Sequence, residues 1–555
     1  MADLQTSYDY VIVGGGSAGC VLAARLSEDA DVTVLLLEAG PPDRGLMMQI
    51  PACVYSVYHD RSINWNYQSE PQVNLGGRSI PVPRGRTLGG SSSINALVYL
   101  RGQPQDYDDW ARKGLSDWSF AHCLPYFRKS ETSDRGPSLY RGDSGPLHVQ
   151  SGRLQSPIFD RFLDAAAGAG HAITDDLNGP QPMGFGRMDS TKIGGRRCSA
   201  SVAYLRPAAG RPNLTVATGV LVHKLLLDGS RATGVVAQRG SERLSLMARR
   251  EVVLATGAIN SPQLLMLSGI GPADELRRHG INVALDHRDI GKNLQDHLNL
   301  GLSFRCREPA SLAWIGSPLG KAMVGARWLA FKDGPAASNI WEVGGFARTD
   351  PVHDRPGVHY HLGPMMIEPN EKGFRLAHGF MLHMAQLRQK SRGRLTLRSA
   401  IPTDAPVIDF NFLAEPQDLI DMREGLKVTR DIVAQPAIAR LGTSEIVPGD
   451  GIRTDAEIER MLRERLMTEF HPSCTCRMET DDHAVVDGQL RLRGIDGLRV
   501  VDASVMPDIV GANLNATVIM IAEKAADMIR GRSPLPPSNL AQSDLVQAAS
   551  VQTCQ

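Results

Sequence analysis

A glycine-rich turn at residues 14–19 constrains the fold of this 555-residue chain more than any other stretch. The turn follows the apolar run at residues 10–13 and opens a helix-like stretch at residues 18–28. Gly14 lets the chain turn tightly, Gly16 lets the backbone approach a pyrophosphate, and the helix amino terminus supplies unpaired N–H groups. The pattern predicts a βαβ unit with a diphosphate site at this turn.

A carboxylate follows at the spacing that such a unit requires. The next strand, residues 32–37, ends at Glu38, about twenty residues after the turn, where an acidic side chain meets a ribose hydroxyl. The competing interpretation is a chance glycine loop, since the chain contains 55 glycines. Strand, helix, second strand and Glu38 together favour a nucleotide site, without distinguishing a nicotinamide from a flavin dinucleotide.

The length and charge of the chain limit its organisation and its partners. At 555 residues it is too long for one ordinary core, so two or more domains are expected. The 60 basic residues balance the 60 acidic ones, so no overall field attracts nucleic acid. We expect a small-molecule partner and no nucleic acid.

The amino terminus and the cysteines indicate the compartment. Residues 1–5 have no basic or apolar stretch typical of a signal peptide, and no run approaches the about 18 apolar residues that span a bilayer. We expect a cytoplasmic protein, with contact at the periphery of the inner membrane left open. The 8 cysteines are scattered and match no disulfide framework. Cys474 and Cys476 lack the spacing of a metal site and are interpreted as core residues, so no metal is expected.

Two further stretches favour ligand contact. The glycine and serine cluster at residues 84–95 precedes an apolar run at residues 96–100, so we expect it to pack against a planar or phosphorylated ligand rather than lie in solvent. Near the carboxyl end, Pro472 stiffens the loop that carries His471, and residues 511–517 open an apolar helix. Asn513 or Asn515 is either an N-cap or part of a helix terminus facing a ligand. His297 is interpreted as a structural hydrogen-bonding residue.

Together these stretches resemble the glucose-methanol-choline (GMC) oxidoreductase family over residues 8–532. The motifs that carry the resemblance are residues 14–19 with 38–40, residues 85–95, residues 257–271, and His471 with residues 502–504 and Asn515. The resemblance implies an α/β fold (α+β overall) with a Rossmann-like FAD-binding domain and a substrate-binding lobe of antiparallel sheet and helices. We assign residues 1–155, 212–310 and 465–535 to the FAD domain, 156–211 and 311–464 to the substrate lobe, and 536–555 to a mobile tail.

The resemblance also implies the residues that hold FAD. These are Gly14, Gly16, Ser17, Ala18, Gly19, Glu38, Ala39, Arg86, Gly89, Gly90, Asn95, Ala96, Val98, Val220, Asp502, Ala503, Asn515 and Thr517. Some relatives attach FAD covalently through a histidine, but this chain has Ile94 at that place. Noncovalent FAD is therefore expected.

The implied reaction is oxidation of a primary alcohol to an aldehyde. His471 matches the active-site histidine of the family, and Asn515 takes the place where members carry histidine or asparagine. Alcohol oxidation removes a hydroxyl proton and a hydride from one carbon, so the site needs a base or alkoxide stabiliser beside the flavin. Histidine serves that role near neutral pH, while an amide holds the same oxygen without taking the proton.

The substrate and the electron acceptor stay open at this point. The carboxyl-terminal half resembles choline dehydrogenases and related aliphatic alcohol dehydrogenases, and Glu342 either faces a trimethylammonium group or supports the lobe. Electrons pass to a quinone or another carrier, with an oxidase that uses oxygen as the alternative. The same scaffold supports hydroxynitrile lyases, a light-driven fatty-acid decarboxylase and, as the plainest alternative, a flavin-binding protein without catalysis.

Overall fold

A seven-stranded sheet forms the first of two layers in the computed structural model, which describes residues 4–350, 352, 354–370 and 373–540. Its order is β11-β2-β1-β14-β13-β12, with β28 paired to β14. The strands are β1 Ser7–Val13, β2 Val34–Glu38, β11 Leu214–Thr218, β12 Val220–Asp228, β13 Arg231–Arg239, β14 Glu242–Leu254 and β28 Leu498–Val500. Strands β11, β2, β1, β14 and β28 pair in parallel. The buried, mostly apolar sequences of β1 and β2, at the centre of this parallel part, suit strands that are covered on both faces.

Two helices far apart in sequence lie side by side on this sheet. They are α1 (Ser17–Leu26) and α14 (Asn515–Ile529), the latter buried along most of its length. The Arg25 guanidinium contacts the fully buried Glu523 carboxylate at 2.8 Å, and Tyr204 donates to the same carboxylate. A buried charge of this kind needs such partners. The pair therefore fixes the carboxyl-terminal helix against the amino-terminal βαβ unit.

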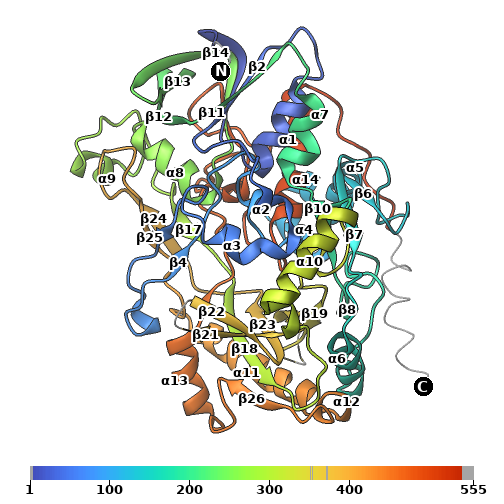
Figure 1. The fold of residues 1–555 in the computed structure, drawn as a ribbon. Coiled ribbons are helices and arrows are strands. Elements are labelled where there is room, and N and C mark those ends of the chain that lie inside the picture. Colours follow the sequence, from blue (N-terminus) through green and yellow to red (C-terminus); the bar gives the residue numbers. More distant parts are fainter. Residues whose placement is uncertain (1–3, 351, 353, 371–372, 541–555) are drawn as a thin grey trace.

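The second layer is an antiparallel sheet below the first in Figure 1. Its order is β26-β18-β23-β20-β19-β8, with β27 paired to β18. The strands are β8 Gly184–Arg187, β18 Leu298–Arg305, β19 Val343–Ala347, β20 Val358–Gly363, β23 Gly379–Gln386, β26 Ser444–Val447 and β27 Met467–Thr468. Helices α6 (Pro157–Gly168), α11 (Pro416–Ala434) and α13 (Asp455–Arg465) pack against this layer. The two-layer arrangement confirms the expected fold class.

The remaining elements connect or flank the two layers. The helices are α2 Leu46–Gln49, α3 Val54–Tyr58, α4 Pro104–Arg112, α5 Phe120–Ser130, α7 Arg206–Ala208, α8 Gly257–Leu267, α9 Ala273–Arg278, α10 Pro318–Phe331 and α12 Pro436–Ala439. The strands are β3 Tyr67–Gln68, β4 Pro81–Val82, β5 Val98–Tyr99, β6 Glu131–Ser133, β7 Leu147–Ser151, β9 Asp189–Ile193, β10 Arg196–Arg197, β15 Ile270–Gly271, β16 Leu285–Asp286, β17 Lys292–Leu294, β21 Met366–Asn370, β22 Gly373–Ala377, β24 Gly393–Thr396 and β25 Val407–Asp409. Within the described part of the chain, no helix has the length and apolar character to cross a membrane.

Two sequence expectations differ in detail from the structure. Residues 106–129 have a helical pattern of apolar residues in the sequence, and the structure divides this stretch into α4 and α5, with Gly114 between them at a left-handed φ of +89°. Strand β18 lies within residues 212–310, which the sequence assigned to the FAD domain, but it pairs in the second sheet. The division into lobes stays a proposal, and this pairing favours a boundary before Leu298.

The carboxyl-terminal tail was expected to be mobile over residues 536–555. Residues 541–555 lie outside the described residues. In the described part, the Ser538 backbone N–H donates to the Ala121 carbonyl at 2.8 Å. The Leu535 N–H likewise donates to the Tyr126 hydroxyl at 3.1 Å. The start of the tail is therefore hydrogen-bonded to α5.

Candidate active site

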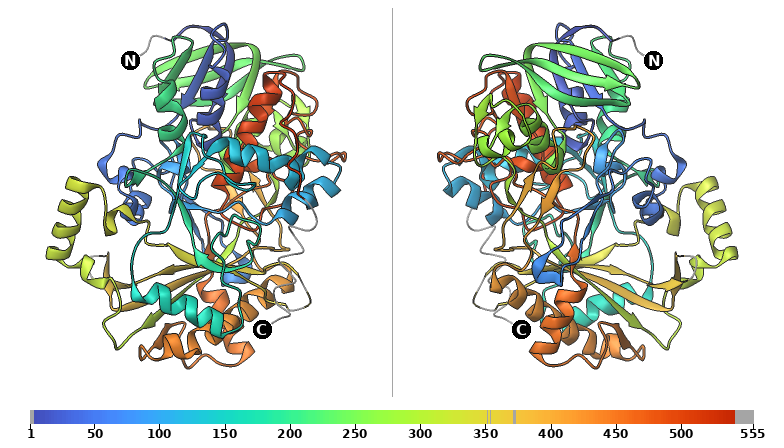
Figure 2. Two further views of the ribbon diagram at one scale, coloured as in Figure 1. Left: turned by 90° about the vertical axis from the view of Figure 1, so that its right-hand side faces the viewer. Right: turned by 90° about the vertical axis from the view of Figure 1, so that its left-hand side faces the viewer.

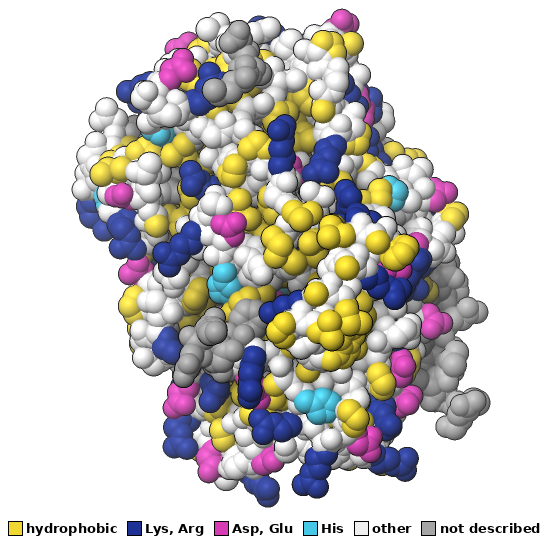
Figure 3. Space-filling model, viewed as in Figure 1, with side chains coloured by type: hydrophobic (Ala, Val, Ile, Leu, Met, Phe, Trp, Pro, Cys, Tyr) yellow, Lys and Arg dark blue, Asp and Glu magenta, His cyan; other side chains and the backbone are white. Residues whose placement is uncertain are grey.

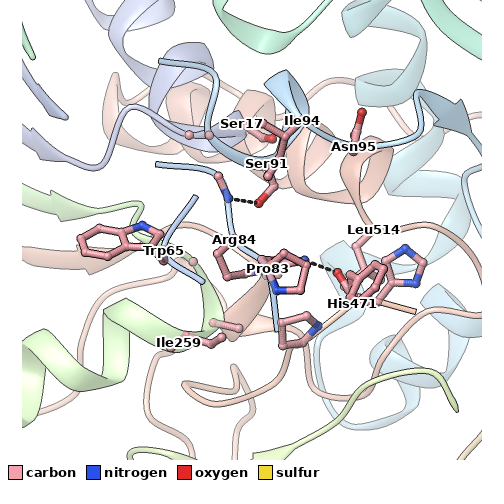
Figure 4. A pocket seen from close by; sticks show the side chains of 18 of the residues that line it. Ser17, Trp65, Pro83, Arg84, Ser91, Ile94, Asn95, Ile259, His471 and Leu514 are labelled. Carbon is pink, nitrogen blue, oxygen red and sulfur yellow. Dashed lines mark hydrogen bonds between the residues drawn. The ribbon is translucent and has the colours of Figure 1, made fainter. Parts of the chain in front are cut away.

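A cavity of about 740 Å³ runs between the two layers. The carboxyl ends of β1, β2 and β14 open into it from the first sheet, where ligands bind in open α/β folds. Its other wall includes residues of the antiparallel sheet, among them His361 and His383. Figure 4 shows Ser17, Ile94 and Asn95 above the cavity and His471 beside Arg84 below. The cavity therefore extends from the glycine turn at one end to the histidines at the other.

Main-chain atoms of two glycine loops build the end near β1. Gly14 has a φ of +100°, and a Cβ there would lie 2.6 Å from the Ala255 carbonyl oxygen. A Cβ on Gly19 would lie 1.9 Å from the Gly14 carbonyl oxygen, and one on Gly90 would lie 2.7 Å from Gly16 Cα. The loops also touch directly, because the Gly89 N–H donates to the Gly15 carbonyl at 2.7 Å. Only glycine fits these approaches, which leaves the backbone open to a ligand.

Glu38 lies in this cradle as the sequence predicts. Its carboxylate accepts hydrogen bonds from the backbone N–H of Gly15 at 2.9 Å and of Gly40 at 2.7 Å. Burial raises the pKa of Glu38 to about 7, despite these N–H donors. The backbone bonds hold the side chain at the end of β2, where it lines the cavity. This is the position of the carboxylate in a dinucleotide site.

A second buried carboxylate, Asp502, binds the start of helix α8 and the turn that follows β28. Asp502 accepts from the Gly257 N–H at 2.9 Å, at the beginning of α8, and from the Ser504 N–H at 2.8 Å. Burial raises the pKa of Asp502.

Ser17, at the start of α1, donates a hydrogen bond to the side-chain oxygen of Asn515, at the start of α14, at 2.7 Å. The amino termini of α1 and α14 therefore converge at the cavity, where their dipoles favour a ligand with negative charge.

His471 lies at the junction of the two sheets and is held at three points. Its backbone N–H donates to Asp296 at 2.8 Å, its Nδ1 lies 3.0 Å from Nδ1 of His297, and its Nε2 lies 3.3 Å from the Asn513 side-chain nitrogen. The residue before it, Phe470, has a left-handed φ of +67°, and its carbonyl accepts from Arg84. Burial, with His297 and the Arg84 guanidinium nearby, holds the pKa of His471 well below its ordinary value. The imidazole is therefore neutral and able to accept a proton at neutral pH.

The contacts in the structure favour a different partner for His471, and the catalytic role of either asparagine stays a prediction. The sequence resemblance selected Asn515, but Asn515 bonds Ser17, while Asn513 contacts the His471 ring. The reason is helical geometry: α14 begins at Asn515, so that side chain belongs to the first turn, whereas Asn513 lies in the preceding loop. Both asparagines line the cavity. Asn513 replaces Asn515 as the proposed second residue of the active-site pair.

A cluster of histidines and one carboxylate forms the far end of the cavity. His361 Nδ1 lies 3.4 Å from Glu469, and His383 Nδ1 lies 3.1 Å from the Asn299 side-chain nitrogen. Burial alone would raise the pKa of Glu469, but His361 outweighs it and the pKa lies below its ordinary value. His359, His361 and Glu469 offer ligand atoms within 4.8 Å of one another, and among the described residues they are the group that could hold a metal ion.

Most predicted FAD residues line the cavity. These are Gly14, Gly16, Ser17, Ala18, Glu38, Ala39, Gly90, Asn95, Ala96, Val98, Val220, Asp502, Ala503 and Asn515. Gly19 and Gly89 stand behind them in the glycine loops, and Arg86 stacks over the Trp65 ring at 5.2 Å. Thr517 hydrogen-bonds the Tyr107 hydroxyl at 2.8 Å, one turn into α14. These four residues do not line the cavity but lie behind the residues that do. Their contact with FAD stays a prediction.

Glu342 has protein partners of its own. It is 1% exposed, contacts Lys192 Nζ at 2.9 Å and accepts from the Leu154 N–H at 2.5 Å. It is not among the residues that line the cavity. A carboxylate neutralised by a buried lysine is poorly suited to attract a second cation. The arrangement favours the supporting role that the sequence left open beside cation binding.

Sequence reasoning missed three residues of the site. His297 was interpreted as structural, and Asp296 and Glu469 were not singled out, yet all three contact or neighbour the histidines of the cavity. Their proximity comes from the pairing of β18 with β27, which joins residues 298–299 to 467–468. Asp296 and His297 lie at the end of a polar stretch, residues 291–297, just before the apolar residues of β18, and this was the available signal.

Comparison with known proteins gives similarity over nearly the whole chain. Two family models described as GMC oxidoreductase match residues 8–299 and 389–522. The chain is 47% identical over 536 residues to an oxygen-dependent choline dehydrogenase of Paraburkholderia phymatum, covering 96% of this chain and 94% of that protein. It is also 47% identical over 545 residues to that of Ectopseudomonas mendocina, covering 97% and 96%. The solved structure of pyridoxine 4-oxidase from Mesorbium loti matches with a TM-score of 0.85 at 33% identity, covering 95% of this chain and 100% of that one.

Proposed function

The chain belongs to the GMC oxidoreductase family, and on that premise we propose that it oxidises a primary alcohol to an aldehyde with His471 as the base. It is an FAD-dependent oxidoreductase acting on CH–OH donors. The observation that carries the proposal is the half-buried, neutral His471 ring at the cavity with Asn513 against its Nε2. A base and an amide at one point suit an alcohol oxygen.

The cradle fits the family cofactor. A Cβ on Gly14 or Gly90 would close the approach to the backbone, and the amino termini of α1 and α14 supply free N–H groups for phosphate and flavin oxygens. Bound FAD supplies the acceptor for the hydride that leaves the alcohol carbon. Ile94 lines the cavity and has no nucleophilic atom, which supports noncovalent attachment. Flavin that is released by acid precipitation is the expected result, and flavin that stays with the polypeptide would contradict it.

His471 has the hydrogen bonds that a proton acceptor needs. The Asn513 side-chain N–H faces Nε2, so Nε2 is unprotonated and Nδ1 carries the ring proton. Nδ1 then donates to Nδ1 of His297, which orients the ring toward the cavity. When an alcohol is bound, Nε2 takes the hydroxyl proton, and the Asn513 amide holds the alcohol oxygen. This division of roles leaves the substrate carbon free to lose its hydride.

Two classes of substrate are candidates. Choline-like alcohols are supported by the names of the 47%-identical relatives. Uncharged primary alcohols are supported by the buried Lys192–Glu342 pair, which occupies the carboxylate that the sequence proposed for a cation. Glu469 is the carboxylate that reaches the far end of the cavity, beside His361. The contact with His361 leaves less of this carboxylate open to a cationic group.

We further propose that electrons pass to a quinone or another carrier, with peripheral membrane contact. Oxygen is the competing acceptor, and the printed names of the relatives include it. The test is steady-state turnover with choline and a series of uncharged primary alcohols, each supplied with a soluble quinone under nitrogen or with oxygen alone. Aldehyde formation with the quinone under nitrogen supports a dehydrogenase. Aldehyde formation with oxygen alone, accompanied by production of hydrogen peroxide, supports an oxidase. No aldehyde under either condition would contradict the proposed function.

A further inference from the structure

Helix α10 is apolar but almost wholly exposed. Of its 14 residues, only Gly320 and Trp328 are buried. The exposed apolar side chains on and beside it are Trp314 at 48%, Leu319 at 70%, Met323 at 55%, Leu329 at 61% and Phe331 at 75% of their full area. A helix that is apolar on most sides is normally buried in a core or against another apolar phase. Among the residues that the structure describes, none forms a layer that covers these side chains of α10.

The exposed surface continues onto a second segment. Leu46 and Met47 of α2 and Tyr55 of α3 are 54%, 47% and 42% exposed. The turn at β10 joins the two segments: the Gly195 carbonyl accepts from the Trp328 indole at 2.8 Å, and Arg196 bonds Gln49. Figure 3 shows apolar side chains gathered over α2, α3 and α10, and Figure 2 shows α10 projecting from the body. We call these eight side chains the apolar face.

The charged residues of the two segments that carry the apolar face are all basic. No acidic residue occurs at positions 309–332, which hold Lys321, Arg327 and Lys332. Positions 44–59, which include α2 and α3, also hold no acidic residue and begin with Arg44. The first carboxylate after α10, Asp333, is already bound by Arg327 at 2.7 Å. Apolar and aromatic side chains bordered by bases such as Lys321 are the features of an interfacial helix on an anionic bilayer.

We propose that the apolar face docks on an anionic lipid surface. The large side chains of α10 enter the boundary between headgroups and acyl chains, while Lys321 and Arg196 contact lipid phosphates. A second copy of the chain is a poorer occupant, because a two-fold contact would bring the same bases together. A protein partner would have to supply both acidic groups and a matching apolar surface.

Docking would bring the cavity to the membrane. Tyr55 belongs both to the apolar face and to the cavity lining, and Ala52 and Val54 beside it also line the cavity. A lipid-dissolved quinone would then reach the cavity without crossing water. The access of a quinone rests on the electron acceptor in the proposed function, and the docking specifies the peripheral membrane contact proposed there.

The test is co-sedimentation of the flavin-loaded enzyme with vesicles of phosphatidylcholine, with and without phosphatidylglycerol. We expect binding to the anionic vesicles, and a decrease in affinity of more than about tenfold in the Leu319→Ser/Phe331→Ser variant. Lys321→Glu should weaken binding to anionic vesicles and leave the weak binding to neutral ones unchanged. The matched control is Val73→Ser/Ile173→Ser, which changes two exposed apolar side chains away from the apolar face and should bind like wild type.

Three results would overturn the docking proposal. These are equal vesicle binding by wild type and Leu319→Ser/Phe331→Ser, no binding by wild type, or a wild-type dimer in sedimentation velocity that the same variant dissociates. Flavin content and turnover with a water-soluble acceptor should be unchanged in every variant, which shows that the enzyme is folded. Lost vesicle binding with intact alcohol oxidation would reject docking alone, and vesicle binding without alcohol oxidation would reject the proposed function alone.

Discussion

The two ends of the cavity are built from different materials. The flavin end consists of main-chain atoms: a Cβ on Gly14, Gly19 or Gly90 would lie 2.7 Å or less from a neighbouring backbone atom, and backbone N–H groups bind Glu38. The substrate end consists of side chains from separate elements, with His471 held by His297 and Asn513, and Glu469 held by His361. One end is defined by the absence of side chains and the other by their exact partners.

This difference predicts how each end tolerates change. At the flavin end, adding a single carbon forces backbone movement, so substitutions should remove the cofactor or the fold. At the substrate end, the ring and amide groups lie on an intact scaffold, so substitutions should leave the flavin in place and change rates. The predictions below test that contrast, from the largest effect to the smallest.

The largest effect is expected for Gly19→Ala. The new Cβ would lie 1.9 Å from the Gly14 carbonyl, so helix α1 must move away from the turn. We expect flavin content below about a tenth of wild type, measured by absorbance after purification, because displacements of this kind destabilise by several kcal/mol. Gly210→Ala is the matched control, since a Cβ there meets no atom within 4 Å. Normal flavin content in Gly19→Ala would show that the turn is not the cofactor cradle.

The next effect is expected for His471→Ala. Loss of the base should lower the rate of flavin reduction by alcohol about 10²- to 10⁴-fold with flavin content unchanged. Rapid-mixing absorbance measures that rate directly. A decrease in flavin content equal to the decrease in rate would move His471 from the substrate end to the cofactor cradle.

A smaller effect should separate the two asparagines. Asn513→Ala removes the amide against His471 Nε2 and should slow flavin reduction about 10- to 100-fold, with flavin retained. Asn515→Ala removes the partner of Ser17 at the helix termini and should weaken flavin retention more than it slows reduction. The ratio of bound flavin to reduction rate in the two variants measures the contrast. The reverse pattern would restore Asn515 as the partner of His471.

The pH dependence should be small near neutrality. Burial keeps the pKa of His471 well below its ordinary value of 6.5, so the neutral, proton-accepting form predominates from pH 8 down to 6.5. His471 itself should therefore cause no change in the rate of flavin reduction over this range and should lower the rate only at lower pH, as it becomes protonated. Measurement of the rate in matched buffers checks the sign. A decrease that begins above pH 6.5 would contradict the environment described for His471.

The smallest effect is expected for Glu469→Gln. This change removes the charge opposite His361 without changing the size of the side chain. We expect KM to change a few-fold for a cationic alcohol and less for an uncharged alcohol of equal length, because the His361 ring already contacts the carboxylate and limits its contact with a bound cation. Glu342→Gln serves as the comparison, since Glu342 is bound by Lys192 away from the cavity. A larger effect on KM from Glu342→Gln would return cation binding to that residue.

The same contrast explains what the sequence could predict. The β1-α1-β2 unit, Glu38 and the second glycine cluster were identified because local spacing alone determines a turn that only glycine can form. The His471–His297 contact depends on strand pairing across 174 positions, and the Glu342–Lys192 pair on one across 150, which no local pattern encodes. Asn513 and Asn515 differ only in which side of a helix start they occupy. A helix boundary is uncertain by one or two residues from sequence, and here that shift changes the partner of His471.

Anaerobic flavin bleaching tests the central claim most directly. The purified yellow enzyme and its His471→Ala variant would each be mixed under nitrogen with choline and with a series of uncharged primary alcohols, and the flavin absorbance followed in time. We predict rapid bleaching of wild type by at least one primary alcohol, with aldehyde formed in equal amount, and bleaching about 10²- to 10⁴-fold slower in the variant with full flavin content. No bleaching of wild type by any alcohol, or equal rates in the two proteins, would contradict alcohol oxidation with His471 as the base.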